Sequence, residues 1–236
     1  VFYQPKLCLH TGRLQGLEAL LRWNHPEKGM ISPDQFISVA EETGLIIPIG
    51  KWVVRQACRA SLELAALGMG QIQVAINLSA KQFTDPDLVG SIATILAEEQ
   101  LPAHLLEVEL TESLLLEGNA DTRQQVARLK ALGLTLAMDD FGTGYSSLSY
   151  LKKFPIDVIK IDRSFIKDIP ENEDDMEITS AVIAMAHNLK LKVVAEGIET
   201  AEQAAYLREA GCNLGQGYWF GRPQPAEQLL AVSAPA

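Results

Sequence analysis

The stretch from residue 134 to residue 162, LTLAMDDFGTGYSSLSYLKKFPIDVIKID, decides the fold class. Its first five residues form an apolar run of strand length that ends at Asp139 and Asp140. Its end is a second apolar run, 158–161, followed by Asp162. The residues between, with a short helix predicted near 146–153, are numerous enough for a crossover, so the two strands are predicted to be parallel.

The same unit of apolar strand and amphipathic helix repeats on both sides of this stretch. Further strands are predicted at 74–78, 106–110, 193–195 and, more weakly, 214–218. Helices are predicted at 88–99, 122–132, 176–189, 201–210 and near Gln228. Strands joined by helical crossovers indicate a parallel sheet covered by helices. An open doubly wound sheet is the alternative, but no glycine-rich dinucleotide loop follows the first strand.

The amino-terminal part departs from this pattern. Strands are predicted at 1–9 and 14–22, and only residues 10–13 separate them, which makes an antiparallel hairpin. Helices are predicted at 32–44 and 49–67. With eight strands in all, we expect an α/β fold, a TIM-like (β/α)8 barrel with an antiparallel first strand. We expect residues 170–177, which are acidic, to form a solvated loop.

Length and composition favour one domain spanning residues 1–236, and we expect it to be excised from a larger multidomain protein because the chain opens directly in strand-like sequence. The net charge of −10 argues against nucleic acid as a partner. No run of the sequence is apolar and long enough to cross a membrane, so we expect no membrane contact by this domain and a cytoplasmic location, whether or not the parent protein is anchored to the inner membrane. Three distant cysteines predict neither a disulfide framework nor a zinc site.

Polar residues stand at or near the ends of six apolar strands. They are Glu18, Asn77, Glu109, Asp139 with Asp140, Lys160 with Asp162, and Glu196. For any one of them an ion pair with a helix residue is the simpler explanation. In a barrel, however, the carboxyl ends of the strands converge on one mouth, where so many carboxylates would repel one another. Divalent cations would relieve this repulsion.

The ligand types select the metal. Carboxylate and amide oxygens suit Mg²⁺, Mn²⁺ or Ca²⁺, and no histidine stands at these strand ends, so zinc and iron are poor candidates. The adjacent Asp139 and Asp140 can each reach a different ion, which predicts a two-metal site.

At these residues the sequence resembles the EAL domains, the phosphodiesterases that hydrolyse cyclic di-GMP. The resemblance covers almost the whole chain and rests on eight motifs: Tyr3-Gln4-Pro5, Glu18-Ala19-Leu20-Leu21-Arg22, Asn77-Leu78-Ser79, Glu109-Leu110-Thr111-Glu112, Asp139-Asp140-Phe141-Gly142-Thr143-Gly144, Lys160-Ile161-Asp162, Glu196-Gly197-Ile198-Glu199 and Gln216-Gly217-Tyr218.

The resemblance implies hydrolysis of cyclic di-GMP to linear pGpG by in-line attack of a hydroxide with two divalent cations, Mg²⁺ or Mn²⁺, and inhibition by Ca²⁺. It implies that the first metal is bound by Glu18, Asn77, Glu109 and Asp139 with Glu196 nearby, and the second by Asp140 with Asp139 as the bridge. Catalytic roles are implied for Glu18, for Lys160 beside the attacking water, and for Glu112 as the anchor of a loop. Substrate contacts are implied for Gln4, Leu21, Arg22, Asn77, Asp162, Glu199, Gln216, Phe220 and Pro223.

Several readings stay open at this point. Arg22 shares a strand face with Glu18 by period-two alternation and either binds phosphate or pairs with a carboxylate. The loop Phe141, Gly142, Thr143 and Gly144 is either a tight turn or a mobile loop that carries Asp140. Lys160 either balances charge or acts as a base. Glu107 should point into the barrel, with Lys6 as a candidate partner.

Two rival functions also stay open. One is a receptor that binds cyclic di-GMP without turnover, although the complete ligand set argues against it. The other is an unrelated barrel enzyme that holds a sugar phosphate on backbone amides after the last two strands. As partners, the resemblance implies cyclic di-GMP, a homodimer formed beside the Gly142 loop, and an upstream sensor or GGDEF-type domain.

Overall fold

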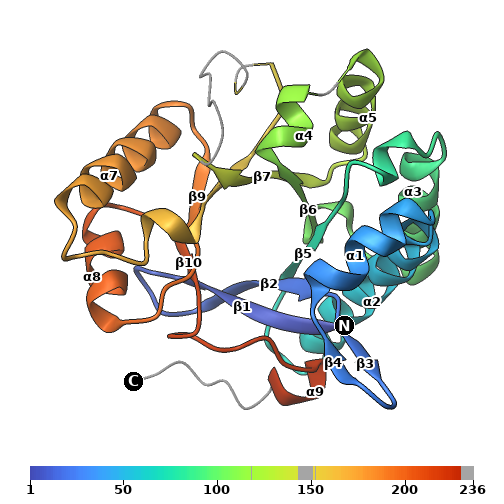
Figure 1. Ribbon diagram of the computed structural model, residues 1–236, viewed down its shortest axis with the longest axis horizontal. Coiled ribbons are helices and arrows are strands. Elements are labelled where there is room, and N and C mark those ends of the chain that lie inside the picture. Colours follow the sequence, from blue (N-terminus) through green and yellow to red (C-terminus); the bar gives the residue numbers. More distant parts are fainter. Residues whose placement is uncertain (118, 143–150, 152, 230–236) are drawn as a thin grey trace.

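In the computed structural model, which describes residues 1–117, 119–142, 151 and 153–229, eight strands close into a barrel (Figure 1). Around the barrel they follow the order β1 (Phe2–Cys8), β10 (Leu214–Gln216), β9 (Lys192–Ala195), β8 (Val158–Ile161), β7 (Thr135–Phe141), β6 (Leu106–Thr111), β5 (Gln73–Asn77) and β2 (Leu14–Leu20). The predicted eight-stranded barrel is confirmed.

Strand β1 is the irregular member. It pairs antiparallel with both β2 and β10, whereas the remaining neighbours pair parallel. The predicted hairpin is therefore confirmed, and its turn is closed by the Gly12 amide, which donates to the Cys8 carbonyl at 2.8 Å. Strand β1 therefore runs against the other strands of the barrel.

Helices surround the strands on the outside (Figure 1). They are α1 (Pro33–Glu42), α2 (Ile46–Ala66), α3 (Leu88–Glu99), α4 (Glu112–Glu117), α5 (Ala120–Ala131), α7 (Glu173–Asn188), α8 (Ala201–Glu209) and α9 (Ala226–Leu229), with short 3₁₀ turns η1 (Gln82–Thr84), η2 (Ala103–Leu105) and η3 (Arg163–Phe165). The helix predicted near 146–153 lies almost entirely outside the described residues. No helix in the described part of the chain is long and apolar enough to cross a lipid bilayer.

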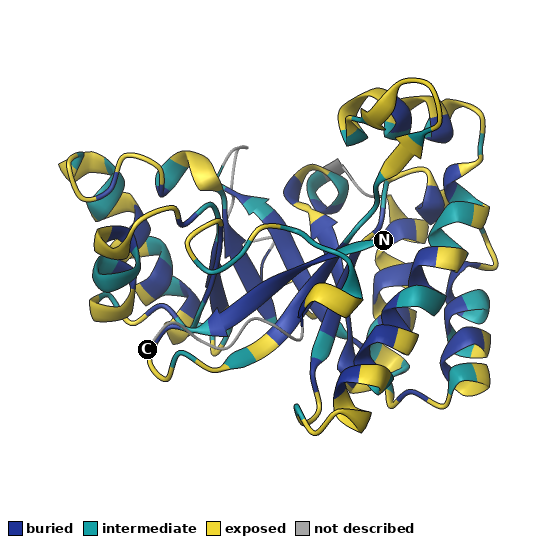
Figure 2. Ribbon diagram, turned by 90° about the horizontal axis from the view of Figure 1, so that it is seen from below, coloured by how far each residue is buried: buried dark blue, intermediate teal, exposed yellow. Residues whose placement is uncertain are grey.

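The apolar core lies mainly between the barrel and its helices. Outward-facing strand residues such as Leu17, Val108 and Leu136 are fully buried against the helical layer, so the strands appear as a buried centre in Figure 2. Inside the barrel a separate small apolar cluster joins Ala137, Val158 and Val194. The interior beyond that cluster is charged, which is unusual because barrels of this class are normally filled by branched apolar side chains.

Two details differ from the sequence-based expectations. Residues 173–177 are not loop but the first turns of α7, because the Asn172 side chain caps the helix by accepting from the amides of Asp174 and Asp175 at 3.0 and 3.4 Å. Acidic residues are favourable there, next to the positive end of the helix dipole. In addition, β2 ends at Leu20, and an unpredicted hairpin of β3 (Trp23–His25) and β4 (Gly29–Ile31) follows it.

The three cysteines are free, as expected, and they differ in environment. Burial raises the pKa of Cys58 to about 11 and that of Cys212 to about 12. Partial burial also opposes ionisation of Cys8, but hydrogen bonds from the Thr11 side chain and backbone outweigh it and lower the pKa of this thiol. An alkylating reagent near neutral pH is therefore expected to modify Cys8 in the native protein and the other two only after denaturation. Peptide mass analysis of the alkylated protein checks this, and native labelling of Cys212 would contradict it.

Candidate active site at the carboxyl end of the barrel

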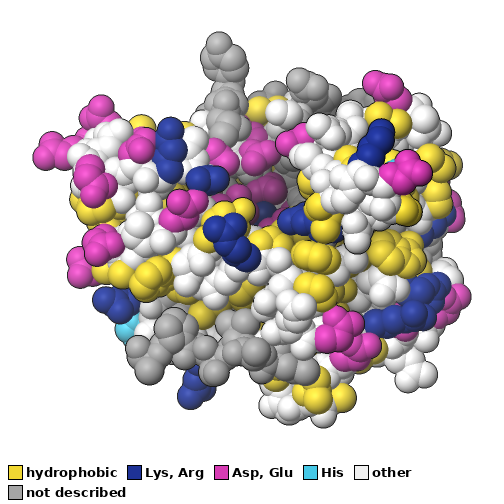
Figure 3. All heavy atoms as spheres, turned by 60° about the horizontal axis from the view of Figure 1, so that its bottom comes forward, with side chains coloured by type: hydrophobic (Ala, Val, Ile, Leu, Met, Phe, Trp, Pro, Cys, Tyr) yellow, Lys and Arg dark blue, Asp and Glu magenta, His cyan; other side chains and the backbone are white. Residues whose placement is uncertain are grey.

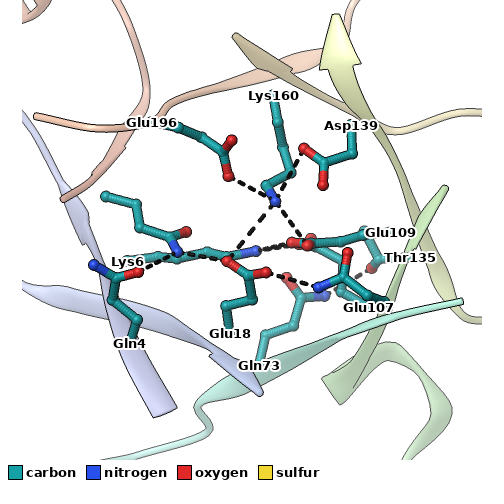
Figure 4. A network of polar contacts seen from close by, with 12 residues as sticks. Gln4, Lys6, Glu18, Gln73, Glu107, Glu109, Thr135, Asp139, Lys160 and Glu196 are labelled. Carbon is teal, nitrogen blue, oxygen red and sulfur yellow. Dashed lines mark hydrogen bonds and ion pairs between the residues drawn. The ribbon is translucent and has the colours of Figure 1, made fainter. Parts of the chain in front are cut away.

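Lys160, on β8, is the centre of a cluster of acidic side chains inside the barrel. Its side chain is 1% exposed, and its Nζ lies 2.7 Å from Glu109 Oε2, 2.7 Å from Glu196 Oε1, 3.1 Å from Asp139 Oδ1 and 3.8 Å from Glu18 Oε2. These carboxylates come from β2, β6, β7 and the residue after β9, so four distant parts of the chain meet at one point (Figure 4). The predicted convergence of strand-end acids is confirmed.

The charges in this cluster are unevenly compensated. Burial, reinforced by the charge of Glu109, raises the pKa of Glu18, and burial with the neighbouring charges of Asp139 and Glu18 raises the pKa of Glu196 to about 8 despite Lys160. Burial likewise raises the pKa of Asp139. Burial alone would lower the pKa of Lys160, but Glu109 and the other acids outweigh it and raise that pKa well above its usual range. The ammonium therefore keeps its proton, while the raised pKa values of Glu18, Asp139 and Glu196 reflect the crowding of several acids around one lysine.

The chemistry of this donor set fits divalent cations. The side chains offer carboxylate oxygens and the Asn77 amide, which are hard ligands preferred by Mg²⁺, Mn²⁺ and Ca²⁺. Among the described residues, no three acidic, histidine or cysteine side chains already stand in the close arrangement of a metal cage, because the carboxylates turn instead toward the Lys160 ammonium. Their oxygens nevertheless lie around one atom, within 3.8 Å of Lys160 Nζ.

A second buried lysine reaches the same cluster from the opposite side. Lys6 Nζ, on β1, lies 2.7 Å from Glu107 Oε1 and 2.6 Å from Glu109 Oε1. Burial opposes ionisation of Glu109, but the charges of Lys160 and Lys6 outweigh it and hold the pKa of Glu109 at about 2. The candidate pairing of Glu107 with Lys6 is thus confirmed.

Amide side chains hold Glu18 in place. Asn77 Nδ2 donates to Glu18 Oε1 at 2.7 Å, and Gln216 Nε2 donates to Glu18 Oε2 at 2.5 Å. Gln216 also donates to Gln4 Oε1 at 3.0 Å, and Gln4 in turn donates to the Gly221 carbonyl at 3.1 Å. The chain of amides joins β1, β2 and β10, the strands at the irregular seam of the barrel.

The end of β7 carries a strained backbone. Asp140 has φ = 56°, a left-handed conformation that costs free energy in a non-glycine residue, and its amide donates to Asp139 Oδ1 at 3.0 Å. Burial and the charge of Asp162 raise the pKa of Asp140.

The Gly142 amide donates to Glu112 Oε2 at 3.1 Å, as expected for a loop anchor. Gly142 has φ = 99°, and a Cβ there would lie 2.8 Å from the Phe165 ring, so glycine is required at this turn. Thr143 and Gly144 lie outside the described residues.

Two cavities open on this face of the barrel. The first has a volume of about 220 Å³ and is lined by Gln4, Glu18, Leu20, Arg163, Glu196, Gly197, Glu199, Gln216, Gly217 and Tyr218. The second, of about 450 Å³, shares Leu20 and includes Leu21, Arg22, Asn77 and Ser79. In Figure 3 acidic side chains lie in a hollow on the face shown. Gln216 Oε1 and Ser79 Oγ are buried and have no hydrogen-bond partner among the described residues.

The strand-face interpretation of Arg22 is wrong, because β2 ends two residues earlier. Its guanidinium instead donates to the Leu21 carbonyl at 2.8 Å and lies 5.9 Å from the centre of the Phe2 ring. No carboxylate pairs with Arg22 in the described part of the chain. Arg22 nevertheless lines the second cavity, beside Asn77.

The remaining predicted contacts fall into two groups. Glu199 lines the first cavity and pairs with Arg163 at 2.7 Å, whereas Asp162 caps η3 by accepting from the Ser164 amide at 3.0 Å. Phe220 lines a different cavity, between β1 and α8, so the structure does not bring it to Glu18. Pro223 lies outside the residues that line either cavity of the mouth.

The sequence interpretation missed Arg163 and Tyr218 as lining residues. Arg163 packs its side chain against Gly197, where a Cβ would lie 2.2 Å from its Cγ, and Tyr218 stacks with Arg222, whose Cζ is 4.1 Å from the ring centre. Arg163 directly follows the Lys160-Ile161-Asp162 motif, and Tyr218 closes the Gln216 motif. Their adjacency to these motifs is the signal that could have identified them.

Two named proteins are similar to this chain in sequence. The chain is 48% identical over 227 residues to the Cyclic di-GMP phosphodiesterase NbdA of Pseudomonas aeruginosa, covering 96% of this chain and 29% of that protein. It is 46% identical over 233 residues to the Bifunctional diguanylate cyclase/cyclic di-GMP phosphodiesterase MucR of the same organism, covering 98% of this chain and 34% of that protein. The chain therefore spans about a third of the length of these relatives.

A solved structure shares the fold. The PaMucR phosphodiesterase in complex with c-di-GMP superposes with a TM-score of 0.92 at 45% sequence identity, covering 97% of this chain and 92% of that chain. The family model described as the EAL domain matches residues 1–223. With its barrel, its strand-end acids and these relatives taken together, the chain belongs to the EAL domain family.

Proposed function

We propose that this domain hydrolyses cyclic di-GMP to linear pGpG with the help of two divalent cations. The observation that carries the proposal is the meeting of Glu18, Glu109, Asp139 and Glu196 around Lys160 at the carboxyl end of the barrel. The names of NbdA and MucR as cyclic di-GMP phosphodiesterases support it, as does the c-di-GMP complex of the structural relative.

We assign the first cation to Glu18, Asn77, Glu109 and Asp139 with Glu196 beside them, and the second to Asp140 with Asp139 between the two. When bound, Mg²⁺ or Mn²⁺ supplies acidification of water and neutralisation of the phosphodiester for in-line attack. Ca²⁺, which is larger and accepts irregular geometry, is expected to bind and inhibit. Asp140 lies in the irregularity of β7 between Met138 and Phe141 and has a left-handed backbone conformation.

We assign to Lys160 a contact with the attacking water. In the arrangement described, its neighbours favour the protonated form, so it acts as a hydrogen-bond donor and positive charge; a role as base requires that the bound cations take over its carboxylate contacts. Glu112 acts through the Gly142 amide, which fixes the end of β7 and hence the position of Asp140. In the described part of the loop, Phe141 and Gly142, this contact supports the end of β7.

The shape of the mouth suits a ligand made of two similar halves. Two cavities share the lining residue Leu20. Each also has a lining residue with a buried oxygen that finds no hydrogen-bond partner in the part of the chain that the structure describes, Gln216 in one and Ser79 in the other. Guanine bases carry N–H donors. Arg163 and Arg22 are the arginines that line the two cavities, and each offers a planar fork of donors that suits phosphate.

Substrate contacts are accordingly proposed for Gln4, Leu21, Arg22, Asn77, Glu199 and Gln216, with Arg163 added. Asp162 remains a proposed contact, although its carboxylate is engaged as a helix cap. The prediction that Phe220 and Pro223 touch the substrate draws no support from their positions.

A turnover assay tests the proposed hydrolysis directly. With Mg²⁺ or Mn²⁺, the domain is expected to convert cyclic di-GMP to pGpG, and a chelator or excess Ca²⁺ is expected to stop the reaction. Chromatography of the nucleotides at a series of times measures it. Unchanged substrate at high enzyme concentration, with ligand binding intact, would favour the receptor interpretation instead.

The sugar-phosphate interpretation is weakened by the hydrogen bonds of three amides after the last two strands. A phosphate cradle needs free backbone amides after the last two strands. Here the Glu196 amide donates to the Ile161 carbonyl, the Ile198 amide to the Gln216 carbonyl and the Glu199 amide to Gln203 Oε1. These amides are used within the protein, and carboxylates face the space in front of them.

For the parent protein, we propose an upstream sensor or GGDEF-type domain, a homodimer formed beside the Gly142 loop, and a cytoplasmic position for this domain, whether or not the parent is anchored to the inner membrane. The relatives are about three times as long as this chain, and MucR is named as bifunctional. Sedimentation of the domain at high concentration tests the homodimer, and a monomer throughout would remove that proposal.

A further inference from the structure

Deeper in the barrel than the proposed metal ligands lies a second layer of charged side chains, formed by Lys6, Glu107 and Glu109. The proposed reaction gives no role to Lys6 or Glu107. Lys6, Glu107 and Glu109 are 3%, 3% and 1% exposed, and no other residue forms an ion pair with Lys6 in the described part of the chain. Glu107 and Glu109 point inward from the same strand because side chains two residues apart share a face. Glu109, the nearer to the mouth, is the member that both layers share (Figure 4).

The two oxygens of Glu109 are held from opposite sides. Oε1 lies 2.6 Å from Lys6 Nζ, and Oε2 lies 2.7 Å from Lys160 Nζ. Lys160 sits among three further carboxylates, and cations arriving in the mouth compete with it for all of them. Lys6 forms no ion pair with those three among the described residues.

We propose that Lys6, itself held by Glu107, is a positioning residue that fixes the Glu109 carboxylate from behind so that its other oxygen is presented to a divalent cation. This inference rests on the proposed function, since it takes Glu109 as a metal ligand. Groups that hold a metal ligand from its far side set its orientation and commonly change metal affinity by about 10- to 100-fold when removed.

The position of Lys6 in β1 explains why a lysine serves here. Lys6 pairs in register with Gly16 of β2 and Gln216 of β10, so its Cα lies in the barrel wall across from β6. A long, unbranched side chain spans the interior from that position.

The simpler explanation is that Lys6 only neutralises Glu107, and the double variant Lys6→Met/Glu107→Gln separates the two. It removes one positive and one negative charge together, so the net charge of the interior is unchanged while the support of Glu109 is lost. Mn²⁺ binding is measured by calorimetry on the whole domain without nucleotide, and folding by the cooperativity of the thermal melt in chelator. The expected result is a cooperative melt with Mn²⁺ affinity weakened about 10- to 100-fold.

The matched control is Lys130→Met/Asp157→Asn, which neutralises a half-exposed pair outside the site. It is expected to bind Mn²⁺ as the parent does. Unchanged or tighter Mn²⁺ binding by the Lys6/Glu107 double variant would overturn the inference and leave Lys6 a structural residue. If that variant does not fold, Lys6→Gln, which keeps a donor, must show weakened binding, and wild-type affinity would overturn the inference equally. A wild-type domain that binds no Mn²⁺ would instead overturn the proposed function, and this inference with it.

Discussion

Replacing Lys160 by methionine is expected to lower the free energy of unfolding by roughly 3–5 kcal/mol in the presence of a chelator, and to abolish turnover. The side chain is fully buried, and its removal leaves four carboxylates facing one another without their shared counter-charge. For a domain of this size, each kcal/mol corresponds to about 2–4 °C in melting temperature, so the expected decrease is on the order of 10 °C.

Divalent cations should reverse part of this loss. Because Mn²⁺ binds the folded state and supplies the missing positive charge, its addition is expected to raise the melting temperature of Lys160→Met more than that of the wild type. Circular dichroism melts with chelator and with Mn²⁺ measure both effects. Lys130→Met is the control, since its partner Asp157 is half-exposed and such pairs contribute only about 0–1 kcal/mol. A variant that melts like the wild type in chelator would show that the acids need no counter-charge.

Replacing Glu18 by alanine is expected to reduce turnover of cyclic di-GMP by roughly 10³-fold or more while leaving the fold intact. Loss of a metal-bound carboxylate removes several kcal/mol of charge stabilisation in the transition state, and each 1.4 kcal/mol is about a factor of ten in rate. The fold tolerates the change because Glu18 is one of several crowded acids whose pKa is raised, and because Lys160 keeps three carboxylate contacts.

The comparison that isolates the metal role uses Glu18→Gln. Glutamine keeps the size of the side chain and an oxygen that accepts from Asn77 or Gln216, but it removes the charge. Both variants are expected to lose turnover, while Glu209→Ala on the exposed end of α8 keeps it. Steady-state rates with saturating Mn²⁺ measure the effect. A near-normal rate in Glu18→Ala would remove this residue from the proposed metal site.

Much of the candidate site could be predicted from where the apolar runs stop. Asn77, Asp139 and Glu196 stand where buried strands end, and parallel strands in a barrel direct such residues to one mouth. The same reasoning identified Glu107 as inward-facing, since it is two residues from Glu109. Local spacing is enough for these inferences because strand alternation and connection length are properties of the chain itself.

The residue at which a strand ends could not be predicted from the sequence in the same way. The sequence 14–22 looks like one continuous strand, yet β2 stops at Leu20, and Arg22 turns its guanidinium to the Leu21 carbonyl. Backbone pairing decides this end: β2 pairs with β5 only as far as Ala19 and with β1 as far as Leu20. Arg22 therefore lies beyond the end of the strand, where alternation no longer sets the direction of a side chain, so its role required the neighbouring strands.

By itself the sequence determined the order of strands and helices, the antiparallel opening hairpin and the set of acids at the mouth. Only the tertiary structure decided which of these groups touch: that Glu109 lies between Lys6 and Lys160, and that Gln4 and Gln216 meet beside Glu18. The physical reason is barrel closure. Alternation fixes which face a side chain takes, but the residue opposite it belongs to a distant strand, and its position depends on the register that the packed barrel and its helices impose.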